Sequence, residues 1–270
     1  MNNYLISVDQ LAACYQHDDV IVVDCRFSLA DTGQGQALYR QSHIPGASYL
    51  HLEKDLSAPK QRHGGRHPLP DINKLEALFS GLGINARTRV IAYDDSRFAF
   101  AARLWWLLRY VGHEQVQLLD GGFKAWCEQG LAVTASEPAN TAQPFVARPR
   151  PQLVVDINEV KTVPHSPGAV LIDSREAKRF LGIEEPIDPV AGHINGAENY
   201  PWQDVTDAKG FFLGADQQRA RWGSLLTRDE IVVYCGSGVT ACVNLFSLAT
   251  VGRDDAKLYA GSWSDWCSFL

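Results

Sequence analysis

The chain has 270 residues, a formal net charge of -6 and a hydrophobic content of 46%, which suffices for one large domain or two of ordinary size. No run is rich in lysine and arginine, so we expect no nucleic-acid partner. No apolar segment approaches the roughly 18 residues of a membrane helix, and the start MNNYLISVDQ lacks the features of an export signal, so we expect no membrane association and a cytoplasmic protein.

Short apolar runs alternate with helix-like segments along the chain. Residues 20–25 (VIVVDC), 89–94 (RVIAYD) and 230–234 (EIVVY) have the composition of buried strands. Residues 71–83 (DINKLEALFSGLG) place their apolar side chains on one helical face and end in glycines. This alternation predicts an α/β fold in which mainly parallel sheets are flanked by helices.

Four segments of the chain occur twice, in the same order. The pairs are IVVDCR at 21–26 with VLIDSR at 170–175, HIPGA at 43–47 with HINGA at 193–197, RVIAYDDSRFAFAARLWWLL at 89–108 with EIVVYCGSGVTACVNLFSLA at 230–249, and LLDGGFKAW at 118–126 with LYAGSWSDW at 258–266. An internal repeat of this kind indicates two homologous domains.

The segment between the two copies is rich in proline and small polar residues, as linkers are. We therefore predict an N-terminal domain at residues 1–135, a linker at 136–151 and a C-terminal domain at 152–270.

A loop with the sequence CGSGVT, from Cys235 to Thr240, follows the strand at 230–234 and precedes a predicted helix at 241–252. Such a turn directs backbone N–H groups and the positive end of a helix toward one centre. Gly236 and Gly238 allow the amides to approach closely, and Ser237 and Thr240 add hydroxyl donors. These surroundings can lower the pKa of a thiol from about 8.5 to roughly 3.5–7.5, so we predict that Cys235 is a nucleophilic thiolate.

The other five cysteines show no CxxC spacing that would indicate a zinc ribbon or a redox pair. We interpret them as small buried apolar side chains in a protein with reduced thiols; they are Cys14, Cys25, Cys127, Cys242 and Cys267.

In the first copy, Asp94 stands where Cys235 stands in the second, and the loop after it contains no glycine. We expect this loop to offer neither a nucleophile nor a cradle of amides for an anion. The N-terminal domain is then inactive and serves as a packing partner and a wall of the cleft.

With D-x-R after an early strand, H-I-x-G-A next and a cysteine loop late in the second copy, the chain resembles the tandem rhodanese sulfurtransferases over essentially its whole length. The loop CGSGVT is similar to that of the 3-mercaptopyruvate sulfurtransferases. The resemblance implies that Cys235 takes a sulfane sulfur from 3-mercaptopyruvate or thiosulfate as a persulfide. The sulfur then passes to cyanide or to a thiol acceptor such as thioredoxin, and no metal or organic cofactor is required.

The same resemblance implies roles for further residues. Ser237 matches a serine that assists proton transfer, with His43 and Asp31 as candidates for the rest of a relay. Arg179, in KRF, is expected to hold the carboxylate of the donor, and the donor is expected to contact the loop at Gly236, Gly238, Val239 and Thr240.

Three alternatives remain open on the sequence. A second carboxylate-binding arginine is expected at the position of Ile187, and its absence would suit an enzyme that prefers thiosulfate. A rhodanese-fold cysteine phosphatase would need an arginine that closes the loop around phosphate, whereas Ala241 follows Thr240 here. A non-catalytic persulfide carrier would keep the loop but turn over small donors slowly.

Overall fold

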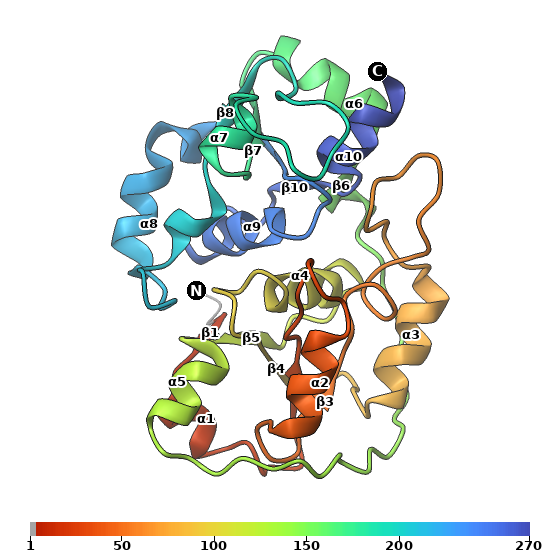
Figure 1. Ribbon diagram of the computed structural model, residues 1–270, viewed down its shortest axis with the longest axis vertical. Helices are drawn as coiled ribbons and strands as arrows, with labels where there is room; N and C mark the ends of the chain where they lie inside the picture. The colour runs from red at the N-terminus through yellow and green to blue at the C-terminus, as the bar shows by residue number, and fades with distance from the viewer. Residues whose placement is uncertain (1–3) are drawn as a thin grey trace.

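The computed structural model describes residues 4–270, and its first half is a five-stranded parallel sheet flanked by helices (Figure 1). The strand order is β1-β5-β4-β2-β3. The elements of this half are β1 (Leu5–Ile6), α1 (Val8–Ala12), β2 (Val20–Asp24), α2 (Gln34–Gln41), β3 (Ser48–Tyr49), α3 (Ile72–Gly81), β4 (Arg89–Tyr93), α4 (Ala101–Tyr110), β5 (Val116–Leu119) and α5 (Gly122–Glu128).

The second half repeats this arrangement with the strand order β6-β10-β9-β7-β8. The predicted α/β class and the repeat are therefore confirmed. Within the part of the chain that is described, no helix is long and apolar enough to cross a bilayer. The strands and α-helices of this half are β6 (Val154–Val155), α6 (Ile157–Thr162), β7 (Ala169–Asp173), α7 (Ala177–Phe180), β8 (Ala197–Asn199), α8 (Gly214–Trp222), β9 (Glu230–Tyr234), α9 (Ala241–Thr250), β10 (Lys257–Tyr259) and α10 (Ser262–Trp266), with short 3-10 turns at Pro151–Leu153, Val163–His165, Trp202–Val205, Gly223–Thr227 and Cys267–Phe269.

The predicted elements coincide closely with the observed ones because their boundaries are set locally. The strands expected at 20–25, 89–94 and 230–234 are β2, β4 and β9. The predicted helix is α3, which begins after Asp71, whose carboxylate accepts a hydrogen bond from the N–H of Asn73 as an N-cap.

The two halves meet through equivalent helices, α4 of the first and α9 of the second, which face each other at the centre of the molecule (Figure 1). Phe246 on α9 packs its ring 5.6 Å from that of Phe98 and 5.4 Å from that of Trp105, between ring centroids. All three are buried in one apolar cluster that includes strands of both sheets. The halves therefore share a core, and their relative position is fixed by side-chain packing.

A long loop between β3 and α3 reaches from the first half to the second, as the orange segment of Figure 1 shows. The N–H of Gly64 donates to Asp265 Oδ1 at 2.6 Å, and the N–H of Arg66 donates to Ser264 Oγ at 3.0 Å. This crossing loop, residues 57–70, is thus hydrogen-bonded to α10 of the opposite half. It brings first-half side chains to the end of the second sheet.

Replacing Phe246 by alanine is expected to lower the free energy of unfolding by about 3–5 kcal/mol, because a buried ring shared by both halves leaves a cavity. Urea denaturation followed by circular dichroism measures the change. Val146→Ala, at a side chain that is 70% exposed, is the control and should change stability by no more than about 0.5 kcal/mol. A loss below about 1 kcal/mol in Phe246→Ala would show that the shared core does not hold the halves together.

Candidate active site

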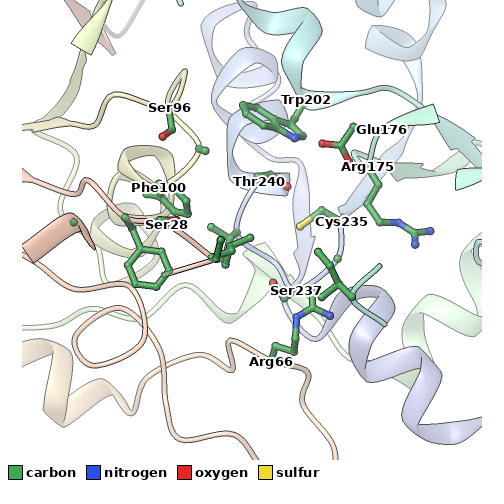
Figure 2. Close-up of a pocket in the computed structure, with 18 of the residues that line it drawn as sticks. Ser28, Arg66, Ser96, Phe100, Arg175, Glu176, Trp202, Cys235, Ser237 and Thr240 are labelled. Atoms are coloured by element: carbon green, nitrogen blue, oxygen red, sulfur yellow. The ribbon is translucent and has the colours of Figure 1, made fainter. Parts of the chain in front are cut away.

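Cys235 lies at the carboxyl end of β9, where the sheet of the second half meets a cleft between the halves. The residue is only 1% exposed, yet it lines this cleft, whose volume is about 710 Å³. Figure 2 shows its sulfur directed into the cleft, with Phe100 and Ser28 of the first half on one side and Trp202 of the second on the other. The thiol is therefore shielded from bulk water but open to a small molecule in the cleft.

The backbone of Cys235 is held by the first two residues of α10. The hydroxyl of Ser262 accepts a hydrogen bond from the N–H of Cys235 at 3.1 Å and donates to Tyr259 O at 2.9 Å. The N–H of Trp263 donates to Cys235 O at 3.0 Å. Ser262 has a φ of 56°, a strained conformation for a residue with a Cβ, and such strain is typical of functional sites.

Two glycines of the cysteine loop lie at close approaches, and at Gly238 the approach is to the backbone. Gly238 has a φ of 75°, and a Cβ there would lie 2.3 Å from Ala260 O. A Cβ on Gly236 would lie 3.0 Å from Arg66 Nη2 and 3.4 Å from Arg179 Nη1. Gly238 thus allows the loop to pack on the β10–α10 turn, and Gly236 leaves room for two guanidinium groups beside the nucleophile.

The equivalent loop of the first half binds its own carboxylate. Four backbone N–H groups donate to the side chain of Asp94 at 2.8–3.1 Å; they belong to Ser96, Phe98, Phe100 and Ala101. The expectation that this loop forms no cradle is therefore wrong. Arg97 and Phe98 adopt positive φ values of 60° and 70° without being glycine, and this allows the loop to wrap around the carboxylate.

In the second half, the residues equivalent to Ser96 and Phe98 are Ser237 and Val239. Cys235 replaces the aspartate at the centre, and the backbone N–H groups of Ser237 and Val239 have no acceptor among residues 4–270. The two loops are similar but not identical. Gly238, like Arg97, has a positive φ, whereas Val239, unlike Phe98, does not, and the N–H of Cys242 donates to Val239 O, whereas that of Ala101 donates to Asp94. The loop of the second half places a thiol where the first half has a carboxylate. Its unpaired N–H groups can stabilise negative charge that forms on or next to the sulfur.

Ser237 is paired with a histidine from the crossing loop. Its Oγ lies 2.7 Å from Nδ1 of His67. Burial, together with the charges of Arg103 and Arg66, lowers the pKa of His67 to about 3. The imidazole is therefore neutral at ordinary pH, and its Nδ1 can accept a hydrogen bond from the Ser237 hydroxyl. His67 also lines a second cavity, of about 690 Å³.

The structure does not bring the two relay candidates from the sequence to this cleft. His43 is fully buried, with Nδ1 2.7 Å from Tyr39 O and Nε2 3.1 Å from Ser136 O, so both of its ring nitrogens are engaged within the first half. Asp31 is exposed and accepts a hydrogen bond from the N–H of Gly33. His67 takes the place expected for His43, and the only sequence signal for it was the glycine- and proline-rich segment HGGRHPLP at 63–70.

Two arginines, one from each half, flank the cysteine loop. Arg179 donates to Glu185 Oε1 at 2.8 Å and to Asp188 Oδ2 at 3.1 Å. Arg66 forms an ion pair with the other oxygen of Asp188. Arg66 Nη2 and Arg179 Nη1 have no acceptor within residues 4–270 and lie beside Gly236. Each guanidinium group thus keeps a free NH₂ group next to the nucleophile.

Arg66 is a site residue that sequence reasoning missed. At the position where a second carboxylate-binding arginine was expected, the chain has Ile187, whose side chain is 47% exposed and lines the cleft. The second guanidinium group comes instead from the crossing loop of the other half.

The pairs Asp24–Arg26 and Asp173–Arg175 form equivalent buried ion pairs in the two halves. In each pair an arginine Nη2 lies 2.6 Å from a carboxylate oxygen, and both partners are buried. Arg175 also lines the cleft, but its guanidinium group forms ion pairs with Asp173 and Glu185.

Comparisons with known proteins agree with this architecture. The family described as "Rhodanese-like domain" matches residues 7–129 and 156–269. A Pseudomonas aeruginosa protein named "Probable 3-mercaptopyruvate sulfurtransferase" is 45% identical over 267 residues, which are 97% of this chain and 94% of that protein. The thiosulfate sulfurtransferase of Mus musculus is 31% identical over 254 residues, which are 91% of this chain and 84% of that protein.

A solved structure is also similar to the whole chain. The crystal structure of SseA from Escherichia coli, reported for the 3-mercaptopyruvate sulfotransferases, superposes with a TM-score of 0.81 at 32% identity. The superposition covers 97% of this chain and 99% of that one.

The depressed pKa of His67 has a consequence for stability. The unfolded chain binds a proton at a histidine pKa of about 6.5, whereas the folded chain does so only near 3. Stability is therefore lost as the pH falls from about 6.5 toward 3, by up to about 1.4 kcal/mol per pH unit. We expect His67→Asn to lose less stability than the wild type between about pH 7 and pH 5 in urea denaturation.

His17→Asn, at an exposed histidine, is the control and should follow the wild type. Equal losses in the wild type and in His67→Asn would contradict a neutral, buried imidazole at this position.

Proposed function

Because the chain belongs to the rhodanese-like family, as a sulfurtransferase with two such domains in tandem, we propose that Cys235 takes the sulfane sulfur of a small anionic donor as a persulfide and passes it to a nucleophilic acceptor. One observation carries this proposal. The sulfur of Cys235 faces the cleft from a loop whose first-half counterpart surrounds a carboxylate with four N–H groups.

The proposed reaction has two steps. The Cys235 thiolate attacks the thiol sulfur of 3-mercaptopyruvate or the outer sulfur of thiosulfate and forms an S–S bond, while the C–S or S–S bond that held this sulfur in the donor breaks. The electron pair leaves with the pyruvate enolate if the donor is 3-mercaptopyruvate, or with sulfite if it is thiosulfate. A thiol or cyanide then attacks the outer sulfur of the persulfide and releases Cys235 as a thiolate.

Ser237 and His67 have a role in the first step when the donor carries a thiol proton. The neutral imidazole accepts the proton of Ser237, while Ser237 takes the proton of the donor thiol. The imidazole, whose pKa of about 3 makes it a weak base that readily gives up a proton, returns this proton through Ser237 to the leaving enolate, which becomes pyruvate. A donor without a thiol proton, such as thiosulfate, has no need of this pair.

Arg66 and Arg179 are proposed to bind the negative end of the donor. Their free NH₂ groups lie beside Gly236, the residue that follows the nucleophile, and a carboxylate or sulfonate oxygen can accept from both. The contacts of the donor with the loop are assigned to Gly236, Gly238, Val239 and Thr240. Arg66 supplies the cation that Ile187 does not, so the loss of an arginine at position 187 does not by itself favour thiosulfate over 3-mercaptopyruvate.

The same geometry supports an assignment of different roles to the two halves. We assign catalysis to residues 152–270 and treat residues 136–151 as the linker. Residues 1–135 carry no nucleophile, because Asp94 occupies its own loop. A cytoplasmic location with thioredoxin or another thiol as acceptor is consistent with the six free cysteines.

The proposed persulfide can be observed directly by intact mass. Incubation with 3-mercaptopyruvate or thiosulfate is expected to add one sulfur atom, about 32 Da, at Cys235, and cyanide should remove it. Cys235→Ser is expected to gain no sulfur, while the matched control Cys242→Ser keeps the gain.

An adduct on another cysteine, or none with either donor, would reject the proposed nucleophile. Phosphatase turnover without an adduct would instead support the phosphatase alternative. An adduct that cyanide removes only slowly would support a carrier.

The two arginines predict a defect in donor binding. Arg66→Ala and Arg179→Ala are each expected to raise the KM for 3-mercaptopyruvate by roughly 10–100-fold, since each removes one charge-assisted contact to the carboxylate. Steady-state kinetics with both donors measures the change.

Arg62→Ala removes an exposed cation from the same crossing loop and should leave the KM within about threefold of the wild type. If Arg66→Ala also leaves the KM unchanged, the first half does not contribute to donor binding.

A further inference from the structure

Arg103, on α4 of the first half, is a buried arginine that the proposed reaction does not use. Its side chain has no exposed surface and lies behind the cysteine loop of the second half. Nη1 donates to Gly238 O at 3.0 Å, Nη2 donates to His67 O at 3.1 Å, and Leu56 O accepts longer bonds of 3.4 Å. One guanidinium group thus joins the cysteine loop to the crossing loop.

No carboxylate within residues 4–270 forms an ion pair with Arg103. Burial lowers the pKa of Arg103 from its ordinary value, but a guanidinium group stays protonated in proteins. An isolated buried cation is costly unless an opposite charge is close to it. Two other buried arginines, Arg26 and Arg175, each have an aspartate as partner.

The ionisable side chains whose charges act on Arg103 are two thiols, Cys242 and Cys235. Burial raises the pKa of Cys242 to about 12, and its Sγ donates to Gly238 O at 3.4 Å. Cys242 therefore remains a neutral thiol near neutral pH. The group that can supply the missing negative charge is Cys235, as a thiolate or as a persulfide.

Arg103 also fixes the direction of one loop amide. In a trans peptide the C=O and the next N–H point in opposite directions. Because Gly238 O points to Arg103, the N–H of Val239 points away from it, and Val239 lines the cleft. In the first half, the equivalent N–H of Phe98 donates to the Asp94 carboxylate.

We propose that Arg103 is a positioning residue for sulfur transfer: it holds the Gly238 peptide in the orientation that directs the Val239 N–H toward the reacting sulfur, and its charge balances the anion at Cys235. This proposal rests on the proposed function. It places a determinant of the second-half chemistry in the first half, on the helix that packs against α9.

The test compares Arg103→Met, which removes the charge, with Arg103→Lys, which retains it. Single-turnover sulfur loading of Cys235 by thiosulfate is followed by quenched intact mass over a range of donor concentrations. We expect the maximal loading rate of Arg103→Met to fall by about 10²-fold or more, as when one donor to a developing anion is lost. Arg103→Lys should stay within about tenfold of the wild type, because the cation remains.

The donor concentration at half-maximal rate separates this role from donor binding. This half-maximal concentration should change by less than about threefold in Arg103→Met, whereas it should rise in Arg66→Ala and Arg179→Ala, which lose a contact to the donor. Arg109→Met is the matched control: it removes a buried arginine of the same helix that is paired with Glu114 instead. Its loading rate should match that of the wild type, and thermal melts show which variants are folded.

A folded Arg103→Met that loads at the wild-type rate would overturn the proposal, and so would a folded Arg103→Lys as slow as Arg103→Met. If Arg103→Met does not fold, Arg103→Lys decides alone: loading within about tenfold of the wild type supports the charge, and a loss of 10²-fold overturns it. A wild-type protein that gains no sulfur at Cys235 would instead reject the proposed function itself.

Discussion

The structure depends on one interaction, the convergence of backbone N–H groups on a negative charge at the carboxyl end of a central strand. Both halves build this arrangement after equivalent strands, β4 and β9. In the first half the charge is part of the protein, because the Asp94 carboxylate occupies the loop. In the second half a thiol stands at the centre, so the charge can appear and move during a reaction. The residue at this position therefore determines whether the loop holds a carboxylate of its own or a thiol.

Residues of both halves line the cleft at Cys235. The second half supplies Cys235 and Arg179, whereas the first supplies Arg66, His67 and Arg103. The crossing loop and α4 bring these side chains across the interface, and the shared core around Phe246 fixes their distance from the cysteine loop. The first half is thus more than a packing partner, although Asp94 stands where the second half has Cys235. This dependence gives a physical reason for retaining a second copy of the domain.

The sequence predicted what is encoded locally. The repeat, the main strands and the loop at Cys235 could be found because periodicity, glycine spacing and order along the chain specify them. The roles of Arg66 and His67 could not be found in this way. His67 meets Ser237 across 170 positions of sequence, and no pattern around His67 distinguishes it from His43. The cradle around Asp94 was missed for a different reason, since Arg97 and Phe98 adopt left-handed conformations that are usually attributed to glycine.

The central claim is that the loop amides stabilise a negative sulfur at Cys235. A crystal structure of the protein after reaction with thiosulfate tests it most directly. We predict a second sulfur bonded to Cys235 Sγ, with the N–H groups of Ser237 and Val239 directed at it. A second sulfur that points away from these amides, or a persulfide on a different cysteine, would contradict the account.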